Sequence, residues 1–411
     1  MKYVLEQNSW YGDEPVEIEL PDNWTVDYQK LPVDQLAPLA DQEIENKISK
    51  PIASKNIREL SENKKEVVIL FDDISRPTPI QPLAEAVLRE LHASGIKHKS
   101  IRFICALGTH GAHTRIDFEK KLGKHIVKEY PVFNHNPYEN CQAVGITSKG
   151  TKVAINAEVM KCDLKIGLGS ITPHPFNGFG GGAKIIMPGV ACINTIEGNH
   201  KTAIVSLLEK GLNPVTGMGK LESNGMREEI EEVSKMVGFD FKVDVIVNSK
   251  REIVDLFAGD PIKAYYEGAS RAAELYFTIR SADNDIVIVN ANAKANEAVI
   301  AMYLGAMAVK QSGGDLVVIN HTPAGQVPHY LLGPFGRDMG GRMWVGAQPI
   351  NHVNRVIFFT PYPDYSSGMW FCSEEKLCWA NSWEEVLNKL KDHDRESKAA
   401  IIADGTIQYF K

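Results

Sequence analysis

A repeated order of strand, polar turn and helix constrains the fold of this chain most strongly. Residues 66–71 (EVVILF) are a mostly apolar run typical of a buried strand, and a helical stretch follows over 81–93. Residues 101–106 (IRFICA) repeat this run, and helical sequence resumes at Ile116. Strands that alternate with helices assemble into largely parallel sheets with helices on their faces. The pattern therefore predicts an α/β fold.

Polar side chains follow the strands at the points where they end. Asp73 and Arg76 come directly after the first strand, and His110 follows the second. His174 follows a third predicted strand, residues 163–168. Because ligands of open α/β sheets bind at the carboxyl ends of the strands, we expect these side chains on one rim of the sheet.

The turn after the first strand, residues 72–79 (DDISRPTP), has two possible roles. A helix N-terminus offers unpaired N–H groups, and Arg76 adds a positive charge, so the turn suits a phosphate or carboxylate. Alternatively, Asp72 or Ser75 caps the helix and Arg76 pairs with the capping residue. The sequence leaves both open.

A glycine-rich segment, residues 167–200, follows the third strand. Its glycines allow close backbone approach or positive φ, and they are Gly178, Gly180, Gly181 and Gly182. Ala183 and Ile185 flank Lys184, so the segment is not a Walker loop, and no dinucleotide fingerprint is cleanly placed after a strand. Lys184 is then either a covalent anchor activated by partial desolvation or a counter-charge for an anion.

The histidines of this segment do not form a zinc motif. No H-E-x-x-H sequence occurs, and His174 and His200 are far apart along the chain. A single imidazole can still ligate a metal that is held mostly by an organic cofactor.

Composition excludes several classes of function. The 411 residues carry a net charge of −7, which is not the footprint of a nucleic-acid-binding protein. Short basic pairs, such as Lys120 and Lys121, are interpreted as parts of solvent-exposed surfaces. The six cysteines are irregularly spaced, so we expect reduced thiols rather than a metal cage or disulfide framework. No signal peptide and no run of about 18 apolar residues is present, which predicts a cytoplasmic protein without a membrane span.

The chain is expected to form two domains. Residues 1–279 form the first, beginning with a hairpin over 3–20. Residues 280–398 form a second α/β domain, with strands at 286–290, 315–320 and 356–359. The last stretch, 399–411, contains a strand that is expected to pack back on the first domain.

Four motifs in the N-terminal two-thirds carry a family resemblance. They are YGxxPxExELP at 11–21, DDxxRPxP at 72–79, GTH at 108–110, and GSITPH…GxGGGAK…PG…TIxxNH over 169–200. With them the sequence resembles the nickel-pincer lactate racemase (LarA-like) family. The resemblance implies two α/β domains with largely parallel, Rossmann-like sheets and an active-site cleft between them.

The resemblance also assigns roles to residues. The cofactor is a nickel-pincer nucleotide, a pyridinium bisthiocarboxylic acid mononucleotide that carries Ni(II), and the resemblance implies that a thioamide tethers it to Lys184. It implies that His200 ligates the nickel and that His110 and His174 are opposed general acid/base groups. The remaining expected cofactor- and substrate-binding residues are Asp73, Ser75, Arg76, Gly180, Gly181, Gly182 and Asn296.

The implied activity is racemisation or epimerisation of a 2-hydroxy acid through a 2-oxo acid, by reversible hydride transfer to the cofactor. Proteins that synthesise and deliver the cofactor are the implied partners. The second domain departs from the family pattern over 290–297 and 333–346, which favours a substrate other than lactate. Its unassigned candidate residues are Lys294, Arg337, Arg342 and Trp344.

Two other functions stay open. A non-catalytic relative would bind a small anion or the cofactor as a carrier or sensor. The hypothesis that the protein is an NAD-type dehydrogenase is less favoured, because the sequence has no clean dinucleotide-binding fingerprint. The pair His110 and His174 favours an enzyme, because binding alone does not need two opposed bases.

Overall fold

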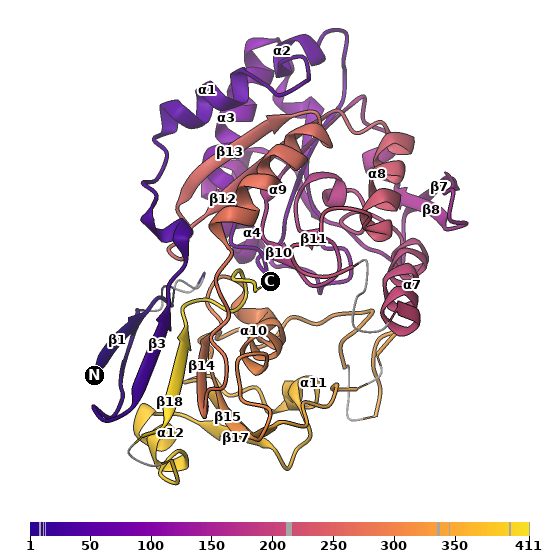
Figure 1. The fold of residues 1–411 in the computed structure, drawn as a ribbon. Coiled ribbons are helices and arrows are strands. Elements are labelled where there is room, and N and C mark those ends of the chain that lie inside the picture. Colours follow the sequence, from indigo (N-terminus) through magenta and orange to yellow (C-terminus); the bar gives the residue numbers. More distant parts are fainter. Residues whose placement is uncertain are drawn as a thin grey trace. The chain divides into compact units, whose positions relative to one another are not determined.

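The computed structural model describes residues 1–7, 10, 12, 14–210, 216–334, 338–344, 346–393 and 396–410, with the backbone alone for 202–210 (Figure 1). The chain divides into two compact units. One is Leu36–Glu274, and the other combines Met1–Gln35 with Leu275–Lys411. Each unit holds one six-stranded, largely parallel sheet, which confirms the predicted α/β class.

The sheet of unit 36–274 has the strand order β13-β12-β9-β4-β5-β6. Only β12 and β13 pair antiparallel. The strands are β4 (Val67–Phe71), β5 (Ile101–Cys105), β6 (Val132–Asn134), β9 (Leu164–Ser170), β12 (Phe241–Val247) and β13 (Ile253–Gly259). The sequence did not predict β13. This strand lies at the edge of the sheet and forms a tight hairpin with β12.

The register of this sheet brings the polar turns together. Phe71 lies opposite both Cys105 and Leu168, and Leu168 lies opposite Val243. The segments that follow β4, β5, β9 and β12 therefore leave the sheet at the same edge. This places the predicted turns with Asp73, His110 and His174 at one rim.

Helices cover this sheet and define its core. Val67, Ile69 and Phe71 of β4 share one apolar cluster with α1, α3 and α4. The helices are α1 (Asp41–Ser49), α2 (Ile57–Leu60), α3 (Ile80–Ala93), α4 (Arg115–Leu122), α5 (Lys124–Glu129), α6 (Ala157–Met160), α7 (Ile193–Lys210), α8 (Gly225–Val237) and α9 (Lys263–Leu275). Short elements complete the unit: η2 (His98–Ser100), β7 (Cys141–Ile146), β8 (Lys152–Asn156), β10 (Pro173–His174), β11 (Gly178–Phe179) and η3 (Gly182–Ile185).

The second unit holds a wholly parallel sheet of order β17-β16-β15-β14-β18-β3. Its strands are β3 (Thr25–Gln29), β14 (Ile286–Asn290), β15 (Gly314–Ile319), β16 (Val353–Phe359), β17 (Leu377–Ala380) and β18 (Lys398–Ile402). Its helices are η1 (Pro32–Gln35), η4 (Ala295–Glu297), α10 (Ala298–Ala306), η5 (Tyr365–Ser367), α11 (Gly368–Phe371) and α12 (Trp383–Lys389). The expected N-terminal hairpin is present as β1 (Lys2–Leu5) and β2 (Val16–Glu19), and Tyr11 and Asp13 between them lie outside the described residues.

The division of the chain differs from the predicted boundaries at the N-terminus. Residues 1–35 belong with the C-terminal unit, because β3 is an edge strand of its sheet and Ile18 and Leu20 pack in its core. The C-terminal strand β18 pairs with β3, which lies within the predicted first domain 1–279, on one side, and with β14 of the predicted second domain on the other. Its run of small and apolar residues, buried after Lys398, suits an interior position in a parallel sheet.

The structure can be compared with two expectations drawn from composition, on the cysteines and on membrane spans. All six cysteines are free thiols, as predicted. Across the described residues, no helix is both long and apolar enough to cross a bilayer.

Candidate active site

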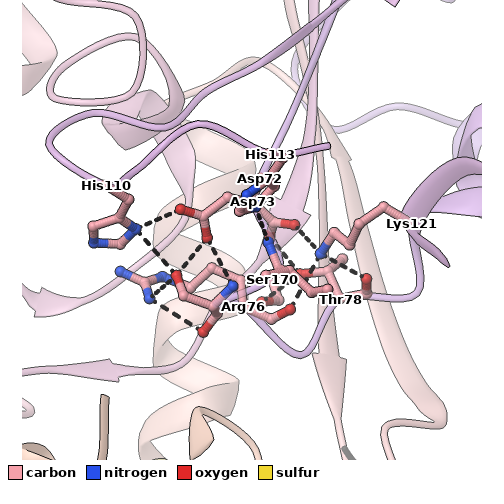
Figure 2. A network of polar contacts seen from close by, with 10 residues as sticks. Asp72, Asp73, Arg76, Thr78, His110, His113, Lys121 and Ser170 are labelled. Atoms are coloured by element: carbon pink, nitrogen blue, oxygen red, sulfur yellow. Dashed lines mark hydrogen bonds and ion pairs between the residues drawn. The ribbon is translucent and has the colours of Figure 1, made fainter. Parts of the chain in front are cut away.

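Asp73 and His110 form a buried pair at the rim of the sheet (Figure 2). They are 3 % and 7 % exposed, and Oδ2 of Asp73 contacts Nδ1 of His110. The other carboxylate oxygen accepts hydrogen bonds from the backbone N–H of Ser75, at 3.0 Å, and from the Ser75 hydroxyl. Burial alone would raise the pKa of Asp73, but the His110 ring and Arg76 outweigh it and hold the pKa below its ordinary value. Asp73 is therefore ionised and fixes the orientation of the imidazole.

Arg76 is attached to the same turn through Ser75. Its Nη1 donates to Ser75 Oγ at 2.8 Å and to the Ser75 carbonyl at 3.2 Å. Helix α3 begins after Pro79, which makes no side-chain cap, so neither Asp72 nor Ser75 caps the helix. The turn therefore presents a guanidinium beside the Asp73–His110 pair.

Lys121 supports this turn through its ammonium group. The prediction that Lys121 belongs to a solvent-exposed face is therefore wrong. Its side chain is fully buried, and Nζ lies 2.6 Å from Oδ1 of Asp72. Nζ also donates to the carbonyls of Arg76 and Thr78, at 3.1 and 3.0 Å (Figure 2). Burial lowers the pKa of Lys121 and raises that of Asp72, and each charge opposes the shift in the other. Helical spacing could have revealed it, because Lys121 shares the buried face of α4 with Phe118 and Leu122.

His113 is a second support for the turn rather than a reactive group. Its Nε2 accepts the backbone N–H of Ile74 at 2.9 Å, next to Asp73 in sequence. Asn134 of β6 holds the His113 backbone at both its N–H and its carbonyl. Burial lowers the pKa of His113, which keeps the ring neutral and able to accept that hydrogen bond.

The glycine run approaches the protein's own side chains closely. Gly181 and Gly182 have φ of +85° and +58°, in the region that favours glycine. A Cβ on Gly182 would lie 2.8 Å from Cγ of Tyr265, and one on Gly181 would lie 2.8 Å from Cγ1 of Ile171. Gly180 has ordinary backbone geometry and ordinary contacts. The expected contact of Gly180, Gly181 and Gly182 with a cofactor stays a prediction.

Two buried charged residues clamp this run, and sequence reasoning missed both. Arg227 of α8 donates to the carbonyls of Phe179, at 2.5 Å, and Gly181, at 3.2 Å. Its guanidinium lies 4.0 Å from the centre of the Tyr265 ring. Asp244 of β12 accepts the N–H of Gly182 at 2.7 Å and pairs with Lys242 at 2.6 Å. The one available signal was the pair of charges inside the apolar strand FKVDVIV.

Lys184 lies in η3 directly after the clamped glycines. Its backbone N–H donates to the Gly181 carbonyl at 3.3 Å, the oxygen that also accepts from Arg227. Its own carbonyl accepts the N–H of Gly189 at 3.1 Å. The side chain is half-buried. The backbone that carries the amine is therefore fixed on both sides.

His200 of α7 has the form that a metal-ligating histidine needs. Its Nδ1 lies 2.9 Å from the carbonyl of Ile196, which can only accept, so Nδ1 carries the hydrogen and Nε2 the lone pair. Burial lowers the pKa of His200 to about 4, the Ile196 hydrogen bond opposes this, and the Lys184 charge adds to it. The ring is therefore neutral at physiological pH and electrostatically coupled to Lys184.

His174 ends β10, which pairs antiparallel with β11. Its Nδ1 accepts the backbone N–H groups of Phe176 and Asn177, each at 3.2 Å. Its ring lies 6.1 Å from that of Phe176, which in turn lies 6.3 Å from the ring of His200. His174 and His200 thus share one aromatic neighbour.

The predicted site residues fall into two groups. Unit 36–274 contains Asp73, Ser75, Arg76, His110, His174, Gly180, Gly181, Gly182, Lys184 and His200. Asn296 lies in the other unit, in η4. Lys294 of that unit is buried, Arg342 is exposed and Trp344 is half-buried, while Arg337 lies outside the described residues.

Among the described residues, His200 is the predicted metal ligand. No three His, Cys, Asp or Glu side chains gather there as a metal cage. His200 nevertheless presents one neutral imidazole next to a half-buried lysine. A neutral imidazole of this kind can serve as a single ligand to a metal that an organic cofactor carries.

Fold and site together define an α/β protein whose sheet edge carries a carboxylate–histidine pair, in a unit that also holds a lysine and a ligand-type histidine. Residues 11–210 match the lactate racemase N-terminal domain. The N-terminal part of the chain thus resembles the N-terminal domain of lactate racemases.

Relatives with sequence similarity include two lactate racemases. The chain is 30 % identical to that of Thermoanaerobacterium thermosaccharolyticum over 249 residues, which are 60 % of this chain and 57 % of the relative. It is 28 % identical to that of Lactiplantibacillus plantarum over 288 residues, which are 68 % of this chain and 66 % of the relative. The matches thus span less than two thirds of either relative.

Two solved structures share the fold. The lactate racemase apoprotein from Thermoanaerobacterium thermosaccharolyticum superposes with a TM-score of 0.75 at 23 % identity, over the whole of both chains. A structural-genomics protein from Thermotoga maritima gives a TM-score of 0.66 at 18 % identity, over 91 % of this chain and 99 % of that one.

Proposed function

We propose that this protein is a racemase or epimerase of a 2-hydroxy acid and carries a nickel-pincer nucleotide. The observation that carries the proposal is the buried, ionised Asp73 fixed against His110, with Arg76 on the same turn. A carboxylate-oriented imidazole accepts a proton from a hydroxyl, and a neighbouring guanidinium binds a carboxylate. A 2-hydroxy acid presents these two groups on adjacent carbons.

Lys184 and His200 are the residues that would hold the cofactor. Lys184 would tether it through a thioamide, and Nε2 of His200 would ligate the nickel. The neutral state of His200 supports this role, because only the unprotonated nitrogen binds a metal. When bound, the cofactor supplies a hydride acceptor, which makes the oxidation of a hydroxy acid to an oxo acid reversible.

The chain's own residues manage the proton and the substrate's charge. His110 takes the hydroxyl proton at Nε2, and Asp73 stabilises the imidazolium that forms. Arg76 binds the substrate carboxylate and fixes the position of C2. Lys121 and His113 keep this turn in place through Asp72, the turn carbonyls and the Ile74 N–H. The 2-oxo acid loses the stereocentre, and return of the proton and hydride on the other face gives the opposite hand.

The proposed substrate is a 2-hydroxy acid other than lactate. The departure of residues 290–297 and 333–346 from the family pattern supports this choice. Asn296 is proposed to contribute to binding, in the place where the family carries a glutamine. Lactate is the substrate in the names of both relatives, so it belongs in every assay panel.

The test begins with production of the chain alongside proteins that make the cofactor. Intact mass and nickel content should show one adduct on Lys184 and one nickel per chain. Lys184→Arg keeps the positive charge but cannot form the thioamide, so it should lose the adduct. An unmodified, nickel-free wild-type chain, under conditions that load a relative, would overturn the cofactor assignment.

Activity is then followed with a panel of single-enantiomer 2-hydroxy acids that includes lactate. Chiral chromatography should show conversion of at least one acid to its mirror image or epimer. Substrate deuterated at C2 should retain its deuterium in the product, because hydride transfer does not exchange with water. Loss of deuterium to solvent would contradict hydride transfer, and fastest turnover of lactate would contradict the substrate assignment.

A further inference from the structure

Two glycines of β9, Gly167 and Gly169, lie directly opposite two charged residues of β12. The parallel register pairs Gly167 with Lys242 and Gly169 with Asp244. All four lie on one face of the sheet, because the residues that alternate with them pack in the apolar cluster of the other face. We call these four residues the η3 platform, since η3, which carries Lys184, packs against β9 and β12.

The two glycines of the η3 platform provide space and not an unusual backbone conformation, since neither has a positive φ. A Cβ on Gly167 would lie 2.9 Å from Cγ2 of Ile185 and 3.0 Å from Cδ of Lys242. A Cβ on Gly169 would lie 3.1 Å from Nζ of Lys242. The strand therefore leaves room for the Lys242 side chain and for Ile185, the residue that follows Lys184.

Lys242 uses this room to hold Asp244, and Asp244 holds the first residue of η3. Both side chains are 1 % exposed. Nζ of Lys242 lies 2.6 Å from Oδ1 of Asp244 and donates to the Val243 carbonyl at 2.8 Å. Oδ2 of Asp244 accepts the N–H of Gly182 at 2.7 Å, two residues before Lys184. One oxygen of the carboxylate is thus fixed by the sheet, while the other fixes η3.

We propose, on the basis of the function proposed above, that Lys242 is a positioning residue for Lys184 and acts through Asp244 and the Gly182 N–H. Apolar residues of similar size often stabilise a protein interior as well as a buried ion pair does, so stability alone does not explain two charges at this point. A hydrogen bond directed at one backbone N–H does explain them, because an apolar pair cannot make it. The η3 platform would keep the Lys184 amine in the place where the cofactor is attached.

Hydrogen exchange on the full, cofactor-free chain tests the η3 platform, with the peptides that cover 182–185 read by mass spectrometry. Lys242→Met removes the ammonium, and exchange over 182–185 should become roughly tenfold faster or more, since the hydrogen bond to Asp244 loses its support. Lys165→Met is the matched control. Lys165 is also a buried lysine of β9, but its Nζ donates to the carbonyl of Cys162, which precedes the strand. Equal acceleration by both variants would overturn the proposal.

A second variant keeps the test decisive, because Lys242→Met leaves the Asp244 carboxylate buried without its cation. The double variant Lys242→Met, Asp244→Asn carries no orphaned charge, and its amide oxygen still offers an acceptor to the Gly182 N–H. The amide is no longer oriented by an ammonium, so exchange over 182–185 should be faster than in the wild-type chain. If Lys242→Met does not fold and the double variant exchanges as slowly as wild type, the proposal is wrong.

The positioning role itself is read from attachment of the cofactor to Lys184 during production with the proteins that make it. Displacement of a reacting group by about 1 Å can slow its reaction by about 10²-fold, so Lys242→Met should lower the fraction of chains with the adduct by roughly 10–100-fold. Acetylation of Lys184 by acetic anhydride needs only an accessible amine and should not fall. Lys165→Met should match the wild-type chain in both measurements.

Two results separate this proposal from the proposed function. If Lys242→Met shows faster exchange over 182–185 but acquires the adduct as the wild-type chain does, Lys242 stabilises η3 without positioning the amine, and the proposal is overturned. If the wild-type chain acquires no adduct under conditions that load a relative, the proposed function fails. The exchange measurement then decides alone whether Lys242 fixes η3.

Discussion

The ammonium of Lys121 lies 2.6 Å from the carboxylate of Asp72, beneath the turn that carries Asp73 and Arg76. The pair fixes the backbone of that turn, because Lys121 also donates to the carbonyls of Arg76 and Thr78. Removing one partner leaves the other charge buried without compensation, which is among the most destabilising changes a protein core can undergo.

Lys121→Met should therefore lower the free energy of unfolding of unit 36–274 by about 3–5 kcal/mol. Lys124→Met, at an exposed lysine in the next helix, should change it by less than about 0.5 kcal/mol. The double variant Lys121→Met, Asp72→Asn should recover part of the loss, because it removes the orphaned charge. All six tryptophans lie outside 36–274. Urea unfolding followed by tryptophan fluorescence therefore monitors the other unit as an internal control, while circular dichroism reports both.

Gly182→Ala tests whether the glycine run is needed for space or only for backbone conformation. The new Cβ would meet Tyr265 at 2.8 Å and would sit at φ +58°, so we expect a loss of about 3 kcal/mol in unfolding free energy. Gly238→Ala is the matched control, since Gly238 has φ +66° and nothing within 4 Å of a Cβ. It should lose only about 1 kcal/mol, the conformational part. Equal losses at the two positions would mean that the contact with Tyr265 is unimportant.

Arg227→Met should loosen the segment that presents Lys184. It removes the donors to the Phe179 and Gly181 carbonyls, and we expect a loss of about 2–3 kcal/mol in unfolding free energy. The fraction of chains that acquire the Lys184 adduct, read from intact mass, should fall as well. Lys235→Met, at an exposed position of the same helix, should change neither quantity. A destabilised variant that still loads fully would show that Arg227 stabilises the fold without positioning the lysine.

Stability should fall between pH 7 and pH 5 in part because of His135. This ring is buried and neutral, with Nε2 donating to Ala191 at 2.9 Å and Nδ1 accepting from Asn156 at 3.1 Å. Burial lowers its pKa to about 4, against an ordinary value near 6.5, although the Ala191 hydrogen bond opposes the shift. The unfolded chain therefore binds more protons than the folded one over this range, and folding weakens as the pH drops.

The size of this effect is measured by comparison with His135→Gln, which keeps a donor and an acceptor but does not titrate. The wild-type chain should lose about 2 kcal/mol more than the variant between pH 7 and pH 5. The comparison cancels the carboxylates that titrate in both proteins. Parallel pH profiles for the two chains would place the folded pKa of His135 close to 6.5.

The fold was largely predictable because the spacing of hydrophobic residues that marks strands and helices is a local property of the sequence. The runs at 66–71 and 101–106 became β4 and β5 with their ends within a residue or so. Pairing between distant segments carries no such local signal. That is why β3 and β18 could not be assigned to one sheet before the register was seen.

Glycine patterns and strand ends marked the candidate residues in the sequence, but no such pattern marked most of the residues that support them. Asp73, His110 and Lys184 follow recognisable turns. Lys121 could have been found from its helical spacing with Phe118 and Leu122, whereas the carbonyls that Arg227 binds are brought to it only by folding. The contact of the His110 ring with Asp73 joins turns that follow two different strands, so only the folded chain makes it.

The pairing of β3 with β18 has a consequence for how the protein is made. Thr25–Gln29 is synthesised before unit 36–274, but its partner Lys398–Ile402 is synthesised after it. Everything needed for the sheet of unit 36–274 is available long before that. Unit 36–274, which carries Lys184 and His200, can therefore complete its sheet during translation, whereas β3 can pair only after β18 has been synthesised.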